Sequence, residues 1–238
     1  MRLDVRRGKV RGIELDDGTL IRCNRVIAAI PPGDVCAISQ EFERVARAKV
    51  AALPQRWGAF VAYCGLPRGV VPTDFATHHQ VIAALDAPLG EGTTSFLSFS
   101  GEADIKRARG GGRAVTISTH TDVARWERAY RDGTGRALAD EYASRLTAAL
   151  DRVLPGATAR AEVLTCATPH TFDRYTARRR GLVGGLPQTP QAAGLRALSH
   201  HTPIAGLYLA GDSIFPGQSS VGATLSGLNA ARAARHLA

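Results

Sequence analysis

The end of the chain, residues 206–238, has residue types and spacing that suit it to holding a ligand. An apolar run, "GLYLA", ends at Gly211 and Asp212, a Pro-Gly turn and two serines follow, and a helical segment rich in small residues comes last. Ligands of α/β proteins bind at the carboxyl edge of the sheet, where this strand delivers Asp212. We expect Ser219 or Ser220 to cap the helix, whose first backbone amides and dipole then favour a negative charge.

The chemistry of this segment favours a ligand with two different ends. A carboxylate beside a helix start repels phosphate but accepts hydrogen bonds from hydroxyl groups. Gly222 and Ala223 allow a ligand to approach the helix amides closely. Reduced flavin, with its polyol hydroxyls and a ring that becomes anionic on reduction, satisfies both requirements. The residues leave an alternative open, an ordinary strand–turn–helix crossover with a surface aspartate.

Other chemistries lack the residues they need. The four cysteines form no C-x-x-C pair, and the adjacent pairs His78-His79 and His200-His201 lack metal-ligand spacing. We therefore expect buried free thiols and no metal site. No G-x-S-x-G motif is present, and the spacing assigns no catalytic residue. The cysteines are Cys23, Cys36, Cys64 and Cys166.

The glycine-rich stretches do not form a dinucleotide fingerprint. Gly133-Thr134-Gly135 follows a helical segment, and "RGGGR" precedes a strand, whereas the fingerprint lies between a strand and a helix. The 238 residues therefore contain no recognisable cradle for the pyrophosphate of a dinucleotide.

Composition bounds the class of protein. The formal net charge is +9, yet it comes mostly from scattered arginines, and only 6% of residues are aromatic. Because bases stack on aromatic side chains set among basic ones, we expect no nucleic-acid partner. The basic cluster Arg178–Arg180 is short and is interpreted as solvated loop charge. The widely spaced cysteines fit a reducing setting, and the expected location is the cytoplasm. No apolar stretch is long enough to span a bilayer, and no signal peptide is recognisable.

Hydrophobic periodicity predicts alternating groups of strands and helices. Residues 5–32 read as a β-meander that turns at Asp16-Asp17-Gly18 and ends with an apolar strand stopped by Pro31-Pro32. Residues 170–195 show no regular period and predict a long loop. The remaining expected strands are 57–65, 80–85, "TTSFLSFS", "RAVTISTHT", "AEVLTCATP" and 206–210, and the expected helices are 34–53, 134–154 and 221–237.

Two segments carry a family resemblance. "TPHTFDRYTARRRGLVGGLPQTP" and "GLYLAGDSIFPGQSSVGATLSGLNAARAA" resemble the C-terminal part of carotenoid desaturases and carotene isomerases. These enzymes form the phytoene-desaturase-like branch of the FAD-dependent amine-oxidase-type oxidoreductases. The run from Gly211 to Gln218 is the most specific piece, and "GKVRGIELDDGTLIRCNRVIAAIPP" is also similar to the hairpin and strand that return from the FAD domain in that family.

The resemblance implies an α/β fold class with an α+β substrate part. It implies a partial Rossmann-like FAD/NAD(P)-binding domain of glutathione-reductase type that lacks its N-terminal βαβ unit, together with a mixed-sheet substrate domain. Residues 1–33 then form the returning meander and strand of the FAD domain, and 34–170 form the substrate domain. Residues 171–238 provide a linker and the strand and helix that complete the FAD domain.

The resemblance also implies the ligand contacts. Asp212 would hold a ribityl hydroxyl of FAD, the helix start would lie against the flavin, and the end of the strand at Ile30-Pro31 would pass near the adenine. The implied cofactor-binding residues are Ile30, Pro31, Gly211, Asp212, Gly217, Gln218, Ser219, Ser220, Val221, Gly222 and Ala223.

The implied function is that of an FAD-dependent oxidoreductase that moves a hydride from a long apolar polyene to flavin, with this chain as its C-terminal portion. Redox-neutral cis–trans isomerisation or saturation of a polyene is the related alternative. The alternative of another class is a non-catalytic fragment or an obligate subunit, whose partner chain carries the G-x-G-x-x-G unit. Members of the family take up their substrates from membrane surfaces, so peripheral association with the inner face of the membrane is expected.

Overall fold

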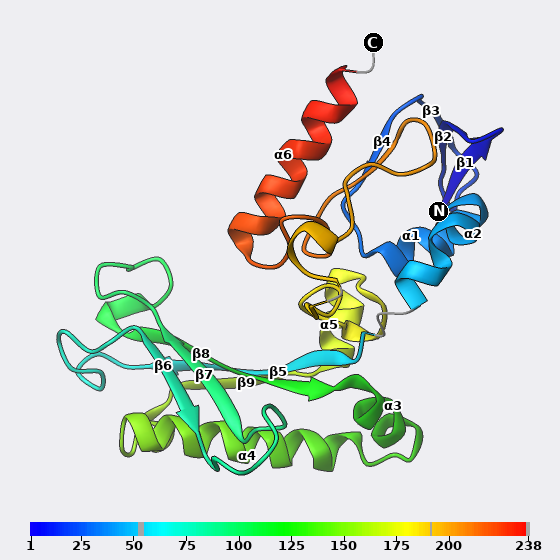
Figure 1. The fold of residues 1–238 in the computed structure, drawn as a ribbon. Coiled ribbons are helices and arrows are strands. Elements are labelled where there is room, and N and C mark those ends of the chain that lie inside the picture. The colour runs from blue at the N-terminus through cyan, green and yellow to red at the C-terminus, as the bar shows by residue number, and fades with distance from the viewer. Residues whose placement is uncertain (52–54, 191, 237–238) are drawn as a thin grey trace. The chain divides into compact units, whose positions relative to one another are not determined.

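The chain forms two compact units, each described here on its own from a computed structural model (Figure 1). The structure describes residues 1–51, 55–190 and 192–236. Unit 1 comprises residues 1–55 and 184–238, and unit 2 comprises residues 56–183. The boundaries predicted from the sequence are 33/34 and 170/171.

Unit 1 begins with a three-stranded antiparallel meander of β1 (Arg2–Arg6), β2 (Lys9–Glu14) and β3 (Leu20–Arg22). The turn expected at Asp16-Asp17-Gly18 joins β2 to β3, and Gly18 has a φ of 82° there. The additional strand β1 reaches β2 through Arg7 and Gly8, both at positive φ. Two successive residues at positive φ match the twist of a tight hairpin.

A second, two-stranded sheet lies in unit 1. β4 (Val26–Ala28) pairs in parallel with β10 (Leu207–Leu209), with Leu207 opposite Val26 and Leu209 opposite Ala28. The two strands are distant in the sequence, since 178 residues lie between Ala28 and Leu207. α6 (Ser220–His236) follows β10 and packs on it through Tyr208, Ala210 and Ala230. The predicted strand 206–210 and helix 221–237 are thus present, and Leu237 lies outside the described residues.

The helix expected over 34–53 is two helices, α1 (Pro32–Ile38) and α2 (Gln40–Ala51), and residues 52–53 lie outside the described part of the chain. The break is at Ser39, whose hydroxyl accepts a hydrogen bond from the amide of Phe42 at 3.2 Å. Such a cap starts a new helix. Val35 and Phe42 are buried in one cluster with residues of β1, β2, β4 and β10, which is why this region belongs to unit 1.

Unit 2 is built on a five-stranded sheet of order β6-β7-β8-β5-β9. The sequence predicted a mixed sheet, but all four strand pairings are antiparallel. Successive strands β6, β7 and β8 are joined by loops that reverse the chain, which produces antiparallel neighbours. The strands are β5 (Trp57–Leu66), β6 (His78–Ile82), β7 (Thr94–Phe99), β8 (Arg113–Asp122) and β9 (Val163–Ala167).

One face of this sheet is covered by α4 (Gly135–Val153), the amphipathic helix expected at 134–154 (Figure 1). Burial alternates along β7 and most of β8, and Phe60 and Leu97 are fully buried in one cluster with Tyr142 and Leu146 of the helix. α3 (Val123–Arg131) connects β8 to α4 and is capped by Asp122, whose carboxylate accepts from the amide of Ala124 at 2.9 Å.

The expected loop over 170–195 contains a helix, α5 (Pro169–Thr176). Thr168 and Thr171 form a reciprocal capping box at its start, and Pro169 occupies a first-turn position where its missing N–H is not needed. These local signals outweigh the weak apolar periodicity. Within the described part of the chain, no helix has both the length and the hydropathy needed to cross a bilayer.

Candidate functional site

The carboxyl ends of β4 and β10 lie side by side in unit 1. The amide of Ala210 donates to the carbonyl oxygen of Ala28 at 3.0 Å, which continues the parallel ladder to the ends of both strands. Ile30-Pro31 and Gly211-Asp212 therefore leave the sheet at the same edge. The structure brings these two groups of predicted site residues together, at the kind of edge where α/β proteins bind ligands.

The loop after β10, defined here as the 211–223 loop, is tied to α6 by a buried serine that the sequence analysis did not single out. Ser226 is fully buried, and its hydroxyl accepts from the amide of Gly211 at 2.8 Å. The same hydroxyl lies 2.7 Å from the carbonyl oxygen of Ala223, which it bonds as a donor. Both ends of the loop thus converge on one side chain.

A second segment, residues 184–188, packs against the 211–223 loop. The amide of Leu186 donates to the hydroxyl of Ser213 at 3.2 Å, and the side-chain amide of Gln218 donates to the carbonyl of Gly184. Gly185 has no room for a side chain, because a Cβ there would lie 2.8 Å from the carbonyl oxygen of Asp212. The segment "GGLPQ" therefore packs on this loop; it lies within one of the two stretches that carry the family resemblance, but it was not among the predicted site residues.

The start of α6 has the capping expected from the sequence. The hydroxyl of Ser219 accepts from the amide of Gly222 at 3.0 Å, so Ser219 is the cap. The amides of Ser220 and Val221 belong to the first turn, where a helix provides no acceptor of its own. Gly222 is required here, since a Cβ would lie 2.4 Å from the carbonyl oxygen of Gly217.

These groups fit the flavin and ribityl portion of a cofactor. Asp212 is half-buried, and its Oδ1 atom accepts from the hydroxyl of Ser213 at 3.3 Å. A carboxylate oxygen accepts more than one hydrogen bond, so ligand hydroxyls can also donate to it. The first turn of α6 contains no acidic residue, and Val221, which is 67% exposed, presents an apolar surface beside the amides. The donor and acceptor set matches a polyol chain and an electron-rich ring.

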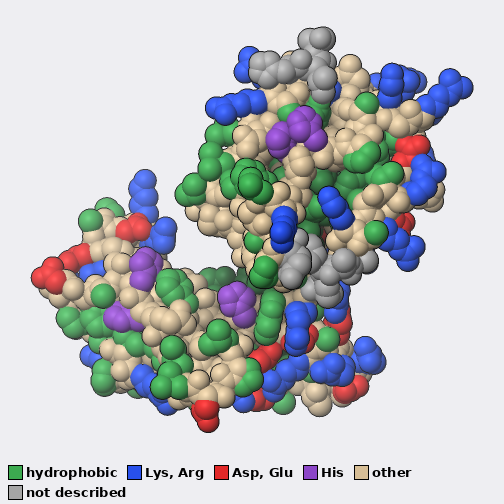
Figure 2. Space-filling model, viewed as in Figure 1, with side chains coloured by type: hydrophobic (Ala, Val, Ile, Leu, Met, Phe, Trp, Pro, Cys, Tyr) green, Lys and Arg blue, Asp and Glu red, His purple; other side chains and the backbone are tan. Residues whose placement is uncertain are grey.

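The sheet of unit 2 presents apolar side chains on the face opposite α4. Strand register sets Gln80, Phe96, Ser118, Val61 and Ala167 in one row across all five strands. Figure 2 shows hydrophobic and histidine side chains over this sheet, while charged side chains gather along α3 and α4. The large side chains exposed on this face are Trp57, Tyr63, Ile82, Phe96 and Val163.

A hollow of about 590 Å³ lies on the same face, near the start of β5. Trp57 and His120 meet edge to face at its floor, with ring centroids 6.5 Å apart. A cavity of this size with mostly apolar walls suits a hydrophobic ligand. Its walls are formed by Trp57, Gln80, Ile82, Leu89, Gly90, Thr94 and His120.

The cysteines and the basic cluster, to which the sequence analysis gave no ligand role, have the following surroundings in the structure. Burial raises the pKa of the Cys64 thiol, and likewise those of Cys36 and Cys166, which disfavours reactive thiolates. Searching the described ranges finds no cluster of three or more His, Cys, Asp or Glu that could bind a metal ion. Arg180 forms an ion pair with Glu127, which lowers the pKa of that carboxyl group.

Comparison with known proteins identifies one family profile and several relatives that match this chain. The profile of the family described as "Flavin containing amine oxidoreductase" matches residues 2–235. The chain is 28% identical over 239 residues to "Prolycopene isomerase, chloroplastic" of Daucus carota, and 27% identical over 234 residues to that of Arabidopsis thaliana. These matches cover 94% and 93% of this chain but only 37% and 38% of those relatives.

A solved structure shows the same fold. The crystal structure of an oxidoreductase from Methanosarcina mazei matches with a TM-score of 0.58 and 15% sequence identity. The match covers 97% of this chain and 48% of the other. At this identity the likeness concerns the fold, and the chain spans about half of that protein.

Proposed function

The chain belongs to the flavin-containing amine oxidoreductase family, and on that premise we propose that it forms part of an FAD-dependent oxidoreductase acting on a long apolar polyene. One observation carries the proposal: the parallel pair β4–β10 brings Asp212 and the start of α6 to one sheet edge. Unit 1 is then a Rossmann-like portion of an FAD-binding domain, and unit 2 is the substrate domain.

Each group at that edge has a role toward the cofactor. Asp212 accepts hydrogen bonds from ribityl hydroxyls, and the amides of Ser220 and Val221 donate to the ring, where the helix dipole favours negative charge. Gly222 allows a close approach to those amides, and Ile30-Pro31 lies toward the adenine. When bound, flavin supplies hydride acceptance and return, and the protein supplies orientation and exclusion of water.

The proposal includes a complementary segment. The 238 residues contain no G-x-G-x-x-G between a strand and a helix, so the pyrophosphate of FAD requires a βαβ unit from elsewhere in the polypeptide or from a partner chain. The two-stranded sheet in unit 1 supports this, because parallel sheets are ordinarily larger and covered on both faces.

The substrate is proposed from the open face of unit 2. The exposed side chains of that face include Trp57, Tyr63 and Phe96. The hollow beside them is walled by Trp57, Ile82 and Leu89, among others. An extended polyene buries its length on such a surface, with a gain of about 25 cal/mol for each Å² removed from water. Because such a substrate is insoluble in water, we propose that the protein acts in the cytoplasm at the membrane surface.

Two reactions are candidates. Desaturation removes two hydrogens from the polyene, one as a hydride to the flavin and one as a proton from the adjacent carbon. Redox-neutral cis–trans isomerisation is the second, and it is favoured by the relatives, which are prolycopene isomerases. Saturation of a double bond with reduced flavin is the reverse of the first.

The test uses the chain co-expressed with a G-x-G-x-x-G-bearing segment and supplied with FAD and detergent-solubilised phytoene or prolycopene. Desaturation lengthens the conjugated system, so the polyene absorbs at longer wavelength and loses two mass units for each new double bond. Isomerisation changes the spectrum and chromatographic retention at constant mass. A complex that retains FAD yet leaves both polyenes unchanged would overturn the proposed activity and favour a non-catalytic subunit.

A further inference from the structure

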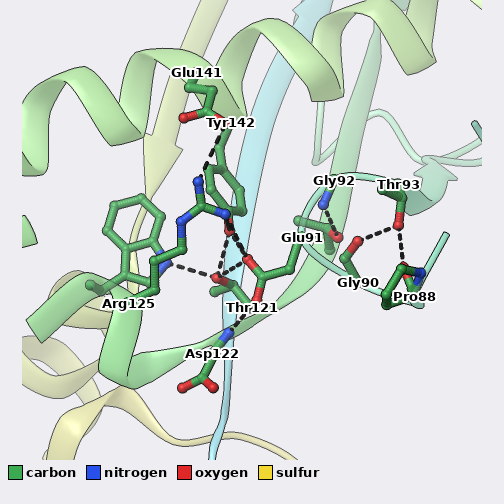
Figure 3. Close-up of polar contacts among 12 residues, drawn as sticks. Pro88, Gly90, Glu91, Gly92, Thr93, Thr121, Asp122, Arg125, Glu141 and Tyr142 are labelled. Atoms are coloured by element: carbon green, nitrogen blue, oxygen red, sulfur yellow. Dashed lines mark hydrogen bonds and ion pairs between the residues drawn. The ribbon is translucent and has the colours of Figure 1, made fainter. Parts of the chain in front are cut away.

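A loop of unit 2, residues 83–93, forms one rim of the hollow, and the carboxylate of Glu91 in this loop bonds to neighbouring elements. Leu89 and Gly90 line the hollow, and Glu91 follows directly in the chain. Figure 3 shows the side chain of Glu91 among residues of β8, α3 and α4. Leu89 and Gly90 of the rim therefore face the proposed ligand, while the side chain of Glu91 faces a polar network.

The carboxylate of Glu91 is the centre of that network. Its Oε1 atom accepts from the amide of Asp122 at 2.7 Å, and its Oε2 atom accepts from the hydroxyl of Thr121 at 2.9 Å. The hydroxyl of Tyr142 also donates to Oε2, and Nη1 of Arg125 lies 3.5 Å from it. Both carboxylate oxygens are thus bonded, and the loop is joined to three elements (Figure 3).

The partners of Glu91 are themselves fixed. Thr121 is fully buried, and its hydroxyl accepts from the indole N–H of Trp126 at 2.9 Å. Tyr142 is fully buried against Phe60, with ring centroids 5.2 Å apart. Hydrogen bonds between buried, immobile partners hold their members more strictly than exposed pairs do.

The backbone of the rim depends on the same residue. Glu91 has a φ of 53°, between Gly90 and Gly92, which also have positive φ. Its amide donates to the carbonyl of His120 at 2.6 Å, and Nη1 of Arg145 donates to its carbonyl at 2.6 Å. A glycine would adopt this conformation without the cost of about 1 kcal/mol that a Cβ adds. The side chain of Glu91 therefore serves a purpose beyond the turn.

The rim fits closely against the floor of the hollow. A Cβ at Gly90 would lie 2.9 Å from the carbonyl oxygen of His120 and 3.5 Å from the ring of Trp57. His120 and Trp57 also line the hollow, so a shift of the rim directly changes the shape of the hollow beside these two residues.

We propose that Glu91 is a positioning residue that fixes the Leu89-Gly90 rim and thereby sets the length of apolar chain that the hollow accepts. This rests on the proposed function in one respect, that the hollow binds the apolar ligand. The network acts through the loop, and Glu91 does not touch the ligand.

The experiment measures binding of cis-parinaric acid, a fluorescent conjugated polyene, to the full chain and its displacement by twelve-carbon lauric acid or eighteen-carbon oleic acid. Glu91→Gln keeps an oxygen for the amide of Asp122 but removes the charge. We expect its preference between the two competitors to fall about fivefold, the effect of one hydrogen bond in a binding constant. Amide hydrogen exchange over residues 83–94 should become faster.

Two further variants keep the inference falsifiable. Arg145→Met removes the bond to the Glu91 carbonyl, together with an ion pair to Glu141 and the stacking of the guanidinium on Tyr142. It should shift the preference in the same direction, even if Glu91→Gln fails to fold. Glu127→Gln breaks an exposed ion pair with Arg180 in the same unit and should leave the preference unchanged.

The outcomes separate the two claims. If the wild-type chain does not bind parinaric acid, the apolar-ligand assignment of the proposed function is wrong, and the rim inference is overturned with it. If the wild type binds but Glu91→Gln and Arg145→Met keep the wild-type preference, only the rim inference is overturned. Lower thermal stability with an unchanged preference would give Glu91 a purely structural role and also overturn it.

Discussion

The two units are stabilised in different ways. The core of unit 2 is aromatic: Phe60 stacks on Trp126, with ring centroids 5.6 Å apart, and both pack on Tyr142. The core of unit 1 is mainly aliphatic, with Val35 and Ile214 among its fully buried residues and Phe42 also packed in it. Its site loop is instead fixed by glycines without room for a Cβ and by hydroxyl groups bonded to the backbone.

Under the proposed function, unit 1 binds the cofactor and unit 2 binds the substrate. Unit 1 leaves backbone amides and a carboxylate at a sheet edge, which suits a polar cofactor. Unit 2 buries one sheet face under α4 and leaves large apolar side chains such as Trp57 and Phe96 exposed on the other, which suits a hydrophobic substrate. Substitutions should therefore affect cofactor binding and polyene binding separately, and the following predictions test that separation.

The largest effect is expected from Phe60→Ala in the aromatic core of unit 2. Truncating a fully buried phenylalanine leaves a cavity and lowers the free energy of unfolding by about 3–5 kcal/mol. Urea unfolding followed by near-ultraviolet circular dichroism measures it. Val163→Ala, at a site that is 56% exposed, is the control and should cost far less. Equal costs for the two variants would mean that the packing described for this core is wrong.

Gly222→Ala should have the next largest effect, on the cofactor. The added Cβ collides with the carbonyl oxygen of Gly217, and overpacking of about 1–3 kcal/mol corresponds to FAD binding about fivefold to 150-fold weaker. Flavin fluorescence titration of the complex with the G-x-G-x-x-G segment measures it. Gly227→Ala is the matched control, because no atom lies within 4 Å of its Cβ position. An equal loss of FAD binding in both variants would mean that a change in the helix itself, and not the collision at Gly222, weakens binding.

Asp212→Asn should weaken FAD binding about tenfold, because a hydrogen bond to a charged acceptor is worth about 1.5–3 kcal/mol and the amide retains part of it. Parinaric acid binding should remain unchanged, since Asp212 is in unit 1. Asp16→Asn, at a carboxylate that is 92% exposed, controls for the loss of charge. A parallel loss of polyene binding would contradict the separation of the two functions.

Phe96→Ala on the open sheet face should weaken parinaric acid binding about threefold to tenfold through lost apolar contact, and leave FAD binding unchanged. Phe96 is 43% exposed in the central row of that face. Ile105→Ala, in a loop of the same unit and 75% exposed, is the control. If Ile105→Ala has the larger effect, the ligand binds elsewhere on unit 2.

The smallest effect concerns pH. Burial lowers the pKa of His200 in unit 1, and the neighbouring His201 lowers it further. The folded state then binds fewer protons than the unfolded state, whose histidine pKa is about 6.5, so stability falls as the pH drops through that value. Urea midpoints measured above and below this pH should differ less in His200→Asn than in the wild type. A wild-type stability that rises on acidification over this range would contradict the assignment.

Local patterns predicted most of the elements. The alternation of β7 and β8, the Asp-Gly turn and the period of α4 all depend on neighbouring residues, and the structure confirms them. The helix break at Ser39 and the capping of α5 were missed because single side-chain hydrogen bonds decide them. Prediction from the sequence relied on hydrophobic periodicity, which does not register such single contacts.

The sequence identified the 211–223 loop but not its supports. Ser226 and the 184–188 segment act through contacts that only the folded chain creates, such as the bond from the Leu186 amide to Ser213. The carboxylate of Glu91 is bonded to residues up to 51 positions away in the sequence, and no sequence motif predicts these contacts. Residue types thus indicated the chemistry of the site, while tertiary packing determined what holds it.

Flavin absorbance after desalting tests the central claim, that unit 1 carries the flavin side of a composite FAD site. The chain is expressed alone and together with a G-x-G-x-x-G-bearing segment, incubated with FAD and passed through a desalting column. We predict no flavin band for the chain alone, a stable band for the pair, and loss of that band in Gly222→Ala but not in Gly227→Ala. Loss of FAD from the wild-type pair, or equal retention by both glycine variants, would contradict the account.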